Sequence, residues 1–150
     1  MKFITSLALF VAAATAAPAA SDVQTAHLTF RPDASHEAYK LQVKADGKSV
    51  LIADQTPIQL IDAPDYLAES FCKFDTVQPG VKFTKIIASD NVTQQVVLNP
   101  PSAIKGVSCE GMCVTTYGNC YDDHTGQFVG PCCNGLCVAN RCRPWNIGQQ

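Results

Sequence analysis

The uneven distribution of the eight cysteines constrains the fold of this 150-residue chain more than any other feature. Residues 21–108 contain only Cys72, whereas residues 109–142 contain the other seven. A segment of about 35 residues buries too little apolar surface to fold unaided, so its stability must come largely from covalent cross-links. This use of cysteine is also uncommon in a reducing cytosol and indicates an oxidising compartment.

The first twenty residues indicate how the chain reaches such a compartment. Lys2 places a positive charge before an apolar stretch that is too short for a transmembrane helix. Ala14 and Ala16 fit the small-residue rule for signal cleavage, and a second acceptable cut follows Ala20. We therefore expect residues 1–20 to be a secretory signal peptide and the mature protein to be secreted and extracellular.

The charge balance narrows the classes of partner. The chain has 11 basic and 13 acidic residues and a net charge of -2, which argues against a strongly basic nucleic-acid binder. The cysteine-rich region has two basic residues, Arg141 and Arg143, and three acidic ones, whereas a membrane-disrupting peptide would be far more basic. We expect no nucleic-acid partner and no membrane insertion.

Residues 21–108 have the pattern of a mainly β region. Apolar and polar residues alternate over 39–44, as in a half-buried strand, and Asp46-Gly47 then provides a hairpin turn. Residues 63–70 allow one helical turn. The predicted strands are 26–30, 39–44, 49–53, 58–61, 71–76, 81–88, 93–98 and 103–108. Their starts recur about every 9 to 13 residues, which predicts an antiparallel β-sandwich-like domain or a small barrel.

Pro100-Pro101 lies close to the boundary between the two regions. A strand-like pattern continues through Ile104 and Val107, so a flexible hinge is not expected. Two prolines here fit a stiff extended step or the start of an edge strand. We therefore predict that the two regions are closely coupled.

The second region has the cysteine order C-x6-C-x11-CC-x3-C-x4-C from Cys113 to Cys142, with turn formers such as Gly118-Asn119 between the cysteines. This order resembles that of a knottin, or inhibitor cystine knot. The resemblance predicts a small disulfide-rich knottin domain over 109–145, followed by a tail at 146–150. It implies the disulfides Cys113–Cys133, Cys120–Cys137 and Cys132–Cys142. Spacing by itself leaves 15 connectivities open.

Cys72 and Cys109 remain once the knot is assigned, and we expect them to pair. The bond encloses 36 residues, for which the chain-entropy model gives about 4 kcal/mol. A rival arrangement places Cys109 inside the compact region and exchanges one of the knot pairings. The sequence leaves this rival open.

The sequence contains little that indicates a metal site or an active site. Cys132-Cys133-x3-Cys137 beside His124 includes zinc-type ligands, but it lacks the usual C-x2-C spacing and secretion favours oxidation. Asp122-Asp123-His124 is interpreted as a solvated turn, as are the carboxylates Asp62 and Asp65. Every cysteine can be paired, and no G-x-S-x-G motif is present. We expect a non-enzymatic protein with no metal, cofactor or catalytic residues.

Asn91-Val92-Thr93 is an N-glycosylation sequon between two predicted strands. Asn91 is therefore a candidate glycosylation site, and a simple Asp-Asn turn is the alternative.

Four aromatic residues of the cysteine-rich region are the candidate binding residues: Tyr117, Tyr121, Phe128 and Trp145. They are too many to be buried in a core made chiefly of sulfur, and exposed Tyr and Trp are common interface anchors. For Trp145 an equal alternative is that it packs back over the sandwich and seals the junction. Hevein-type chitin-binding modules also have adjacent cysteines, but here only Asn134-Gly135-Leu136 follows the pair, without the expected aromatic residues.

The signal peptide, the β-rich middle and above all residues 111–113 through 141–145 resemble small secreted cysteine-rich proteins of filamentous ascomycete fungi. The resemblance is specific over 109–145 and general over 21–108. It implies an exported binding protein. We expect this protein to be a monomer and an effector or elicitor that acts on an extracellular protein of a host or competitor, in the apoplast if the host is a plant. The alternatives are a knottin-type protease inhibitor, a toxin or antimicrobial protein, and a structural cell-wall protein.

Overall fold

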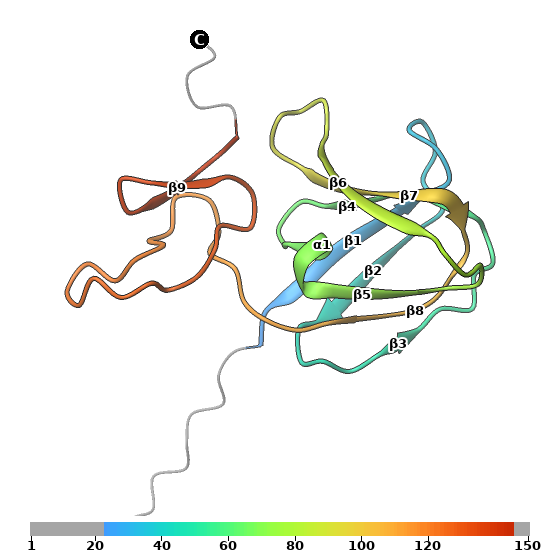
Figure 1. Cartoon of the computed structure of the whole chain (residues 1–150), viewed down its shortest axis with the longest axis horizontal. Coiled ribbons are helices and arrows are strands. Elements are labelled where there is room, and N and C mark those ends of the chain that lie inside the picture. The colour runs from blue at the N-terminus through green and yellow to red at the C-terminus, as the bar shows by residue number, and fades with distance from the viewer. Residues whose placement is uncertain (1–22, 146–150) are drawn as a thin grey trace, which may run out of the picture.

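The computed structural model describes residues 23–145, so the expected signal peptide 1–20 and tail 146–150 lie outside the described residues. The described chain is mainly β, as predicted, and all its paired strands run antiparallel (Figure 1). Its elements are β1 Thr25–Arg31, β2 Tyr39–Lys44, β3 Val50–Leu51, β4 Ile58–Ala63, α1 Ala68–Phe71, β5 Cys72–Thr76, β6 Lys82–Ile87, β7 Gln94–Ser102, β8 Ile104–Cys109, β9 Leu136–Val138 and β10 Arg141–Arg143.

Two sheets enclose the main apolar core. The larger has the strand order β2-β1-β4-β7-β6, and the smaller has the order β3-β8-β5. Alternation along β1 explains its contribution, because Ala26, Leu28 and Phe30 are buried while the residues between them are not. Ile104 and Val107 of β8 join the same cluster from the smaller sheet. Burial of these apolar side chains is the main force holding the sheets together.

The two prolines lie within β7, which differs from the expected start of an edge strand. β7 runs between β4 and β6, so it is an interior strand. Its pairing with β4 is irregular just there: Leu60 pairs with Val97, whereas Ile58 pairs with Ser102. Proline cannot donate a ladder hydrogen bond and is therefore accommodated at such an irregularity. After one further residue the chain continues as β8 in the other sheet.

A short helix connects the two sheets. α1 ends at Phe71 and β5 begins at the next residue, so the helical turn expected within 63–70 forms slightly later. Cys72 of β5 then lies directly opposite Cys109 of β8, and the two form a disulfide. This bond links an edge strand of the smaller sheet to the strand that leads into the cysteine-rich region.

The C-terminal unit follows β8 and contains the β9–β10 hairpin, drawn in orange and red in Figure 1. Three interlaced disulfides cross-link it, in which the first cysteine pairs with the fourth, the second with the fifth and the third with the sixth. They are Cys113–Cys133, Cys120–Cys137 and Cys132–Cys142. Together with Cys72–Cys109, these are the same four pairs that the resemblance and the remaining two cysteines suggested.

The C-terminal unit packs directly against the sheets. Cys113 and Cys133 belong to the main core cluster. The Cys113 N–H donates to Gln24 Oε1 at 2.9 Å, and the Tyr66 hydroxyl donates to the Gly111 carbonyl at 2.9 Å. The two regions are therefore coupled through a shared apolar core and through part-buried hydrogen bonds.

Candidate functional site

Three of the four candidate aromatic residues are exposed on the C-terminal unit. Tyr117 and Phe128 are each 59% exposed, and Tyr121 is 43% exposed. Tyr121 and Phe128 form an isolated antiparallel bridge, and their ring centroids lie 5.3 Å apart in an edge-to-face arrangement. Such a pair holds both rings in a defined orientation while leaving their outer surfaces open to solvent.

The loop between these two rings is organised by Asp122. Its carboxylate accepts the backbone N–H of Thr125 at 2.7 Å, the Thr125 hydroxyl at 2.9 Å and the His124 N–H at 3.0 Å. These hydrogen bonds lower the pKa of Asp122. The backbone N–H of Thr125 has the largest effect, followed by the Thr125 hydroxyl and the His124 N–H. Asp122 and His124 therefore belong to a hydrogen-bonded turn.

Asp123 links this loop to the turn of the β9–β10 hairpin. Its carboxylate accepts the side-chain amides of Asn119 and Asn140. Asn140, which has a positive φ of 62°, also accepts the Tyr121 N–H through its Oδ1 at 2.8 Å. Side-chain hydrogen bonds thus fix the backbone on both sides of Tyr121.

Tyr117 is held separately by the last strand. Its N–H donates to the Cys142 carbonyl at 2.7 Å, and its own carbonyl accepts from Arg141 Nη1 at 3.1 Å. The Arg143 guanidinium carbon lies 5.8 Å from the Tyr117 ring centroid, a cation–π arrangement. The sequence predicted exposure of this ring, whereas its arginine partner became evident only from the structure.

Trp145 is placed differently from the other three aromatic residues. It is only half-exposed, its indole Nε1 is buried, and Lys85 Nζ of β6 lies 5.8 Å from its ring. Contact with β6 removes part of the ring from water, which corresponds to the alternative in which Trp145 seals the junction. We therefore remove Trp145 from the candidate binding surface, which we define as Tyr117, Tyr121 and Phe128.

Three sulfur atoms lie together inside the C-terminal unit. The Sγ atoms of Cys120, Cys132 and Cys142 are all within 4.8 Å of one another and buried. Each belongs to a disulfide, and within residues 23–145 every cysteine is paired. Zinc binds the thiolate, so sulfur atoms that are joined in disulfides are not suited as zinc ligands.

Asp62 and Asp65 have separate partners and do not form a carboxylate pair. Asp62 accepts from Arg31 Nε at 2.6 Å, and this hydrogen bond raises the pKa of Arg31 despite partial desolvation. Asp65 accepts the His27 N–H at 3.1 Å, and its second oxygen lies 2.5 Å from His27 Nδ1. Sequence analysis missed the Arg31–Asp62 ion pair and the His27–Asp65 contact because their members are 31 and 38 residues apart, respectively.

Asn91 lies at the exposed tip of the turn between β6 and β7, with a φ of 55°. The sequon hydroxyl of Thr93 donates to Asp90 Oδ2 at 2.5 Å. The site is open to solvent and forms a tight Asx turn, so the turn alternative and an accessible sequon are both present here. Glycosylation stays a prediction.

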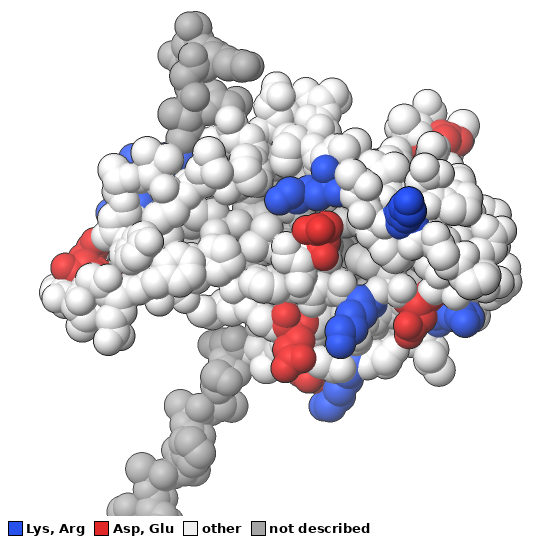
Figure 2. Space-filling model, viewed as in Figure 1, with Lys and Arg blue, Asp and Glu red and all other residues white. Residues whose placement is uncertain are grey.

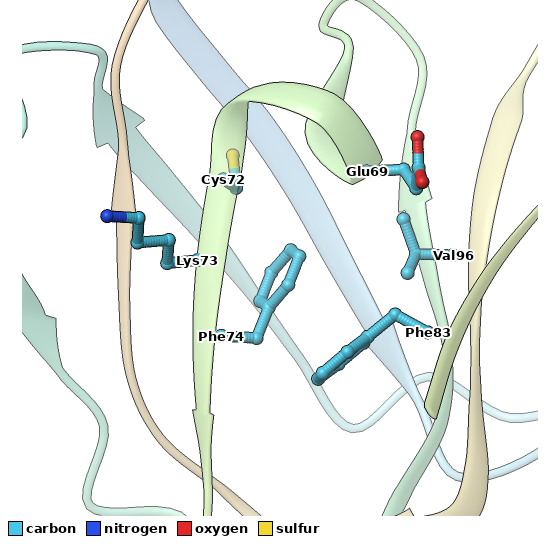
Figure 3. A pocket seen from close by; sticks show the side chains of 6 residues that line it. All are labelled: Glu69, Cys72, Lys73, Phe74, Phe83 and Val96. Carbon is cyan, nitrogen blue, oxygen red and sulfur yellow. The ribbon is translucent and has the colours of Figure 1, made fainter. Parts of the chain in front are cut away.

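Sequence analysis also missed a pocket of about 260 Å³ at the edge of the two sheets (Figure 3). It has no signature in the sequence because its walls come from α1, β5, β6 and β7. Its lining residues are Glu69, Cys72, Lys73, Phe74, Phe83 and Val96.

Charged side chains of both signs are interspersed on the face shown in Figure 2. No helix among residues 23–145 is long and apolar enough to cross a membrane. Comparisons with protein-family models, curated proteins and solved structures found no match.

Proposed function

We propose that this protein is an exported, non-enzymatic binding protein, specifically a fungal effector or elicitor that binds an extracellular host protein. The observation that carries this proposal is the exposure of Tyr117, Tyr121 and Phe128 on a frame cross-linked by three disulfides. Rings that are already held in place lose little conformational entropy when a partner covers them. Exposed aromatic side chains with a fixed orientation are common anchors at protein interfaces.

We further propose that the two sheets form a β-sandwich and that the C-terminal unit is a knottin. In a knottin, Cys132–Cys142 would pass through the ring that Cys113–Cys133 and Cys120–Cys137 close with the intervening backbone. The interlaced pairing and the small β9–β10 hairpin support this assignment. Four disulfides also suit an oxidising extracellular compartment, in line with the proposed signal peptide at residues 1–20.

The test compares the intact oxidised protein with a variant that combines Tyr117→Ala, Tyr121→Ala and Phe128→Ala. Leu51→Ala is a matched control, because Leu51 is 85% exposed but lies on β3. After infiltration of each protein into leaves, we expect the wild type and Leu51→Ala to provoke the same host response. The triple variant should lose this response while keeping its four disulfides.

A host response that is unchanged by the triple substitution would contradict the assignment of the binding surface. The absence of any response to the wild-type protein, together with unaltered virulence of a deletion strain, would contradict the effector proposal itself. Retention of the protein in hyphal walls, measured by fractionation, would instead favour the structural cell-wall alternative.

The position of Phe128 favours protease inhibition as a second candidate. Phe128 is exposed at the end of a loop whose start and end are hydrogen-bonded, with Asp122 N–H donating to the Gln127 carbonyl at 2.8 Å. A rigid loop with an exposed phenylalanine suits a chymotrypsin-like specificity pocket better than a trypsin-like one. Assays against trypsin-, chymotrypsin- and subtilisin-like enzymes test this directly. Tight inhibition that Phe128→Ala abolishes would place inhibition first.

A further inference from the structure

β6 forms an unpaired edge of the larger sheet. It is the terminal strand in the order β2-β1-β4-β7-β6, and five of its six residues are exposed. The Ala88 N–H donates to the Thr93 carbonyl, which fixes the alternation of the β6–β7 ladder. The backbone N–H and C=O groups of residues 82, 84 and 86 therefore hydrogen-bond to β7. Those of Phe83, Lys85 and Ile87 point to the free edge. Within the described residues, these outward N–H and C=O groups have no hydrogen-bond partner.

The same three residues face the space between the sheets. Phe83 lies opposite Leu98, and Lys85 lies opposite Val96, so their side chains share the face of two buried residues. The Phe83 ring contacts Phe74 of β5, with ring centroids 5.7 Å apart. A strand added to β6 would place alternate side chains on this inner face as well.

An apolar pocket lies beside this edge. Figure 3 shows Phe74, Phe83 and Val96 pointing toward one another, and the pocket that they line has a volume of about 260 Å³. The Lys73 side chain points away from the two rings. The pocket is large enough for one bulky apolar side chain, and its walls include β5 and β6, which are edge strands of the two sheets.

The charge on β6 selects among the strands that could pair with it. Lys82 and Lys85 are its only charged residues, and neither forms an ion pair within residues 23–145. Lysines on an edge strand oppose pairing with neutral or basic strands. In antiparallel pairing with a second copy of β6, the lysines of the two copies would repel one another. An acidic strand would be attracted instead.

We propose that the free edge of β6 binds an extended acidic segment of a partner protein, which adds as an antiparallel strand and inserts one large apolar side chain beside Phe83. Backbone hydrogen bonds to Phe83, Lys85 and Ile87 supply affinity, and the pocket and the lysines supply register and specificity. This surface is separate from Tyr117, Tyr121 and Phe128, so the proposal stands or falls independently of the proposed function.

The probe for this site is a fluorescein-labelled, capped heptapeptide, Thr-Val-Asp-Thr-Phe-Glu-Thr. Paired antiparallel, its Asp faces Lys85, its Phe faces Phe83 and its Glu faces Lys82. We expect saturable fluorescence anisotropy with the intact oxidised protein, weakening as salt is raised. N-methylation of the peptide Asp and Phe should lower the affinity by about tenfold or more, because it removes the two inward amide donors opposite Lys85 and Phe83. A peptide with Lys at both acidic positions should not bind.

Two protein variants form a matched pair. Lys85→Ala and Lys85→Pro both lose the ammonium group and its contact with Trp145, but only Lys85→Pro loses the outward N–H. We expect Lys85→Pro to bind about tenfold more weakly than Lys85→Ala. The triple variant of the aromatic surface should bind the probe normally. In NMR spectra of the wild type, the amides of Phe83, Lys85 and Ile87 should gain exchange protection when the peptide is added.

Several outcomes would overturn the proposal. The N-methylated peptide could bind as tightly as the parent, the NMR changes could map to the C-terminal unit, or millimolar parent peptide could fail to bind. A salt-dependent dimer in sedimentation that Lys85→Pro disrupts would instead assign the edge to a second copy. Because the modified peptides leave the protein unchanged, misfolding of Lys85→Pro does not affect the conclusion.

Discussion

Tyr121 and Phe128 stay exposed although both are large and apolar, because the interior beneath them is occupied by sulfur. Cys120, the neighbour of Tyr121, is fully buried and contributes to the cluster with Cys132 and Cys142. Trp145 has a similar chemistry but meets an edge strand and is partly covered. At the residue scale, exposure is therefore decided by what lies opposite each side chain.

The hydrogen bonds that the Asp122 carboxylate accepts should depend on pH. Hydrogen bonds from Thr125 and His124 lower its pKa below the ordinary value of 3.8. The bonds are therefore fully present above the unfolded value and are lost as the pH falls through the folded pKa. We expect the Thr125 amide NMR signal to be constant near neutral pH and to shift below about pH 4. Asp122→Asn keeps an acceptor but cannot titrate, so its Thr125 signal should stay constant, and an identical titration in this variant would contradict the assignment.

The Tyr66 hydroxyl donates to the Gly111 carbonyl across the junction of the two regions. Burial raises the pKa of Tyr66, with a smaller effect of Glu110. Tyr66→Phe removes the donor and leaves the carbonyl unpaired, so the free energy of unfolding should fall by about 1 kcal/mol. Tyr117→Phe is the control, since that side chain is exposed. Equal denaturation midpoints for the two variants would show that the junction bond adds nothing.

Among the structural elements, the positions of β1 to β8 were predictable, but most of their lengths were not, and the short strands β9 and β10 were not predicted. β2 begins and ends where the alternating pattern of residues 39–44 does. β3 is reduced to Val50–Leu51 because it pairs with only two residues of β8. β7 extends through both prolines because β4 resumes pairing at Ser102. Periodicity identifies a strand, whereas its length depends on how much of a neighbour is available for pairing.

The element-scale prediction compares two glycines of the C-terminal unit. A Cβ atom at Gly135, where φ is +132°, would lie 1.8 Å from the Arg143 carbonyl oxygen, so Gly135→Ala cannot keep the close approach of β9 and β10. Gly126 has a φ of +68° and no atom within 4 Å, so Gly126→Ala costs only the strain of a positive φ, about 1 kcal/mol. We expect Gly126→Ala to fold with slightly lower stability. Gly135→Ala should lower the free energy of unfolding by several kcal/mol or prevent formation of Cys120–Cys137. Peptide mass analysis maps the disulfides, and chemical denaturation measures the stability. Native disulfides and wild-type stability in this variant would refute the prediction.

At the scale of the whole molecule, the disulfides differ in what surrounds them. Cys113–Cys133 lies in the core shared by both regions, and Gln24 reaches both of its sulfur atoms. Cys137 of β9, by contrast, is exposed. The C-terminal unit is thus attached through a buried bond and reaches solvent at its hairpin.

This arrangement predicts the order in which a reductant opens the bonds under native conditions. Cys120–Cys137 should be reduced first, since Cys137 is accessible, and Cys113–Cys133 last, since reaching it requires separation of the two regions. Timed reduction, alkylation and mass mapping give the order. Simultaneous loss of all four bonds would show that global unfolding precedes reduction, which contradicts local accessibility.

Patterns in the sequence were enough to predict a mainly β chain and aromatic residues in the cysteine-rich loops. The resemblance to a knottin, with the two cysteines left over, suggested the four disulfide pairs. These features are local, since alternation, turn residues and cysteine spacing act over short stretches of chain. The contact of Trp145 with Lys85 of β6, the contact of His27 with Asp65, and the free edge of β6 beside a pocket became evident from the three-dimensional structure alone. Each of these depends on residues from distant segments brought together by the core, and such proximity has no signature in the order of residues along the chain.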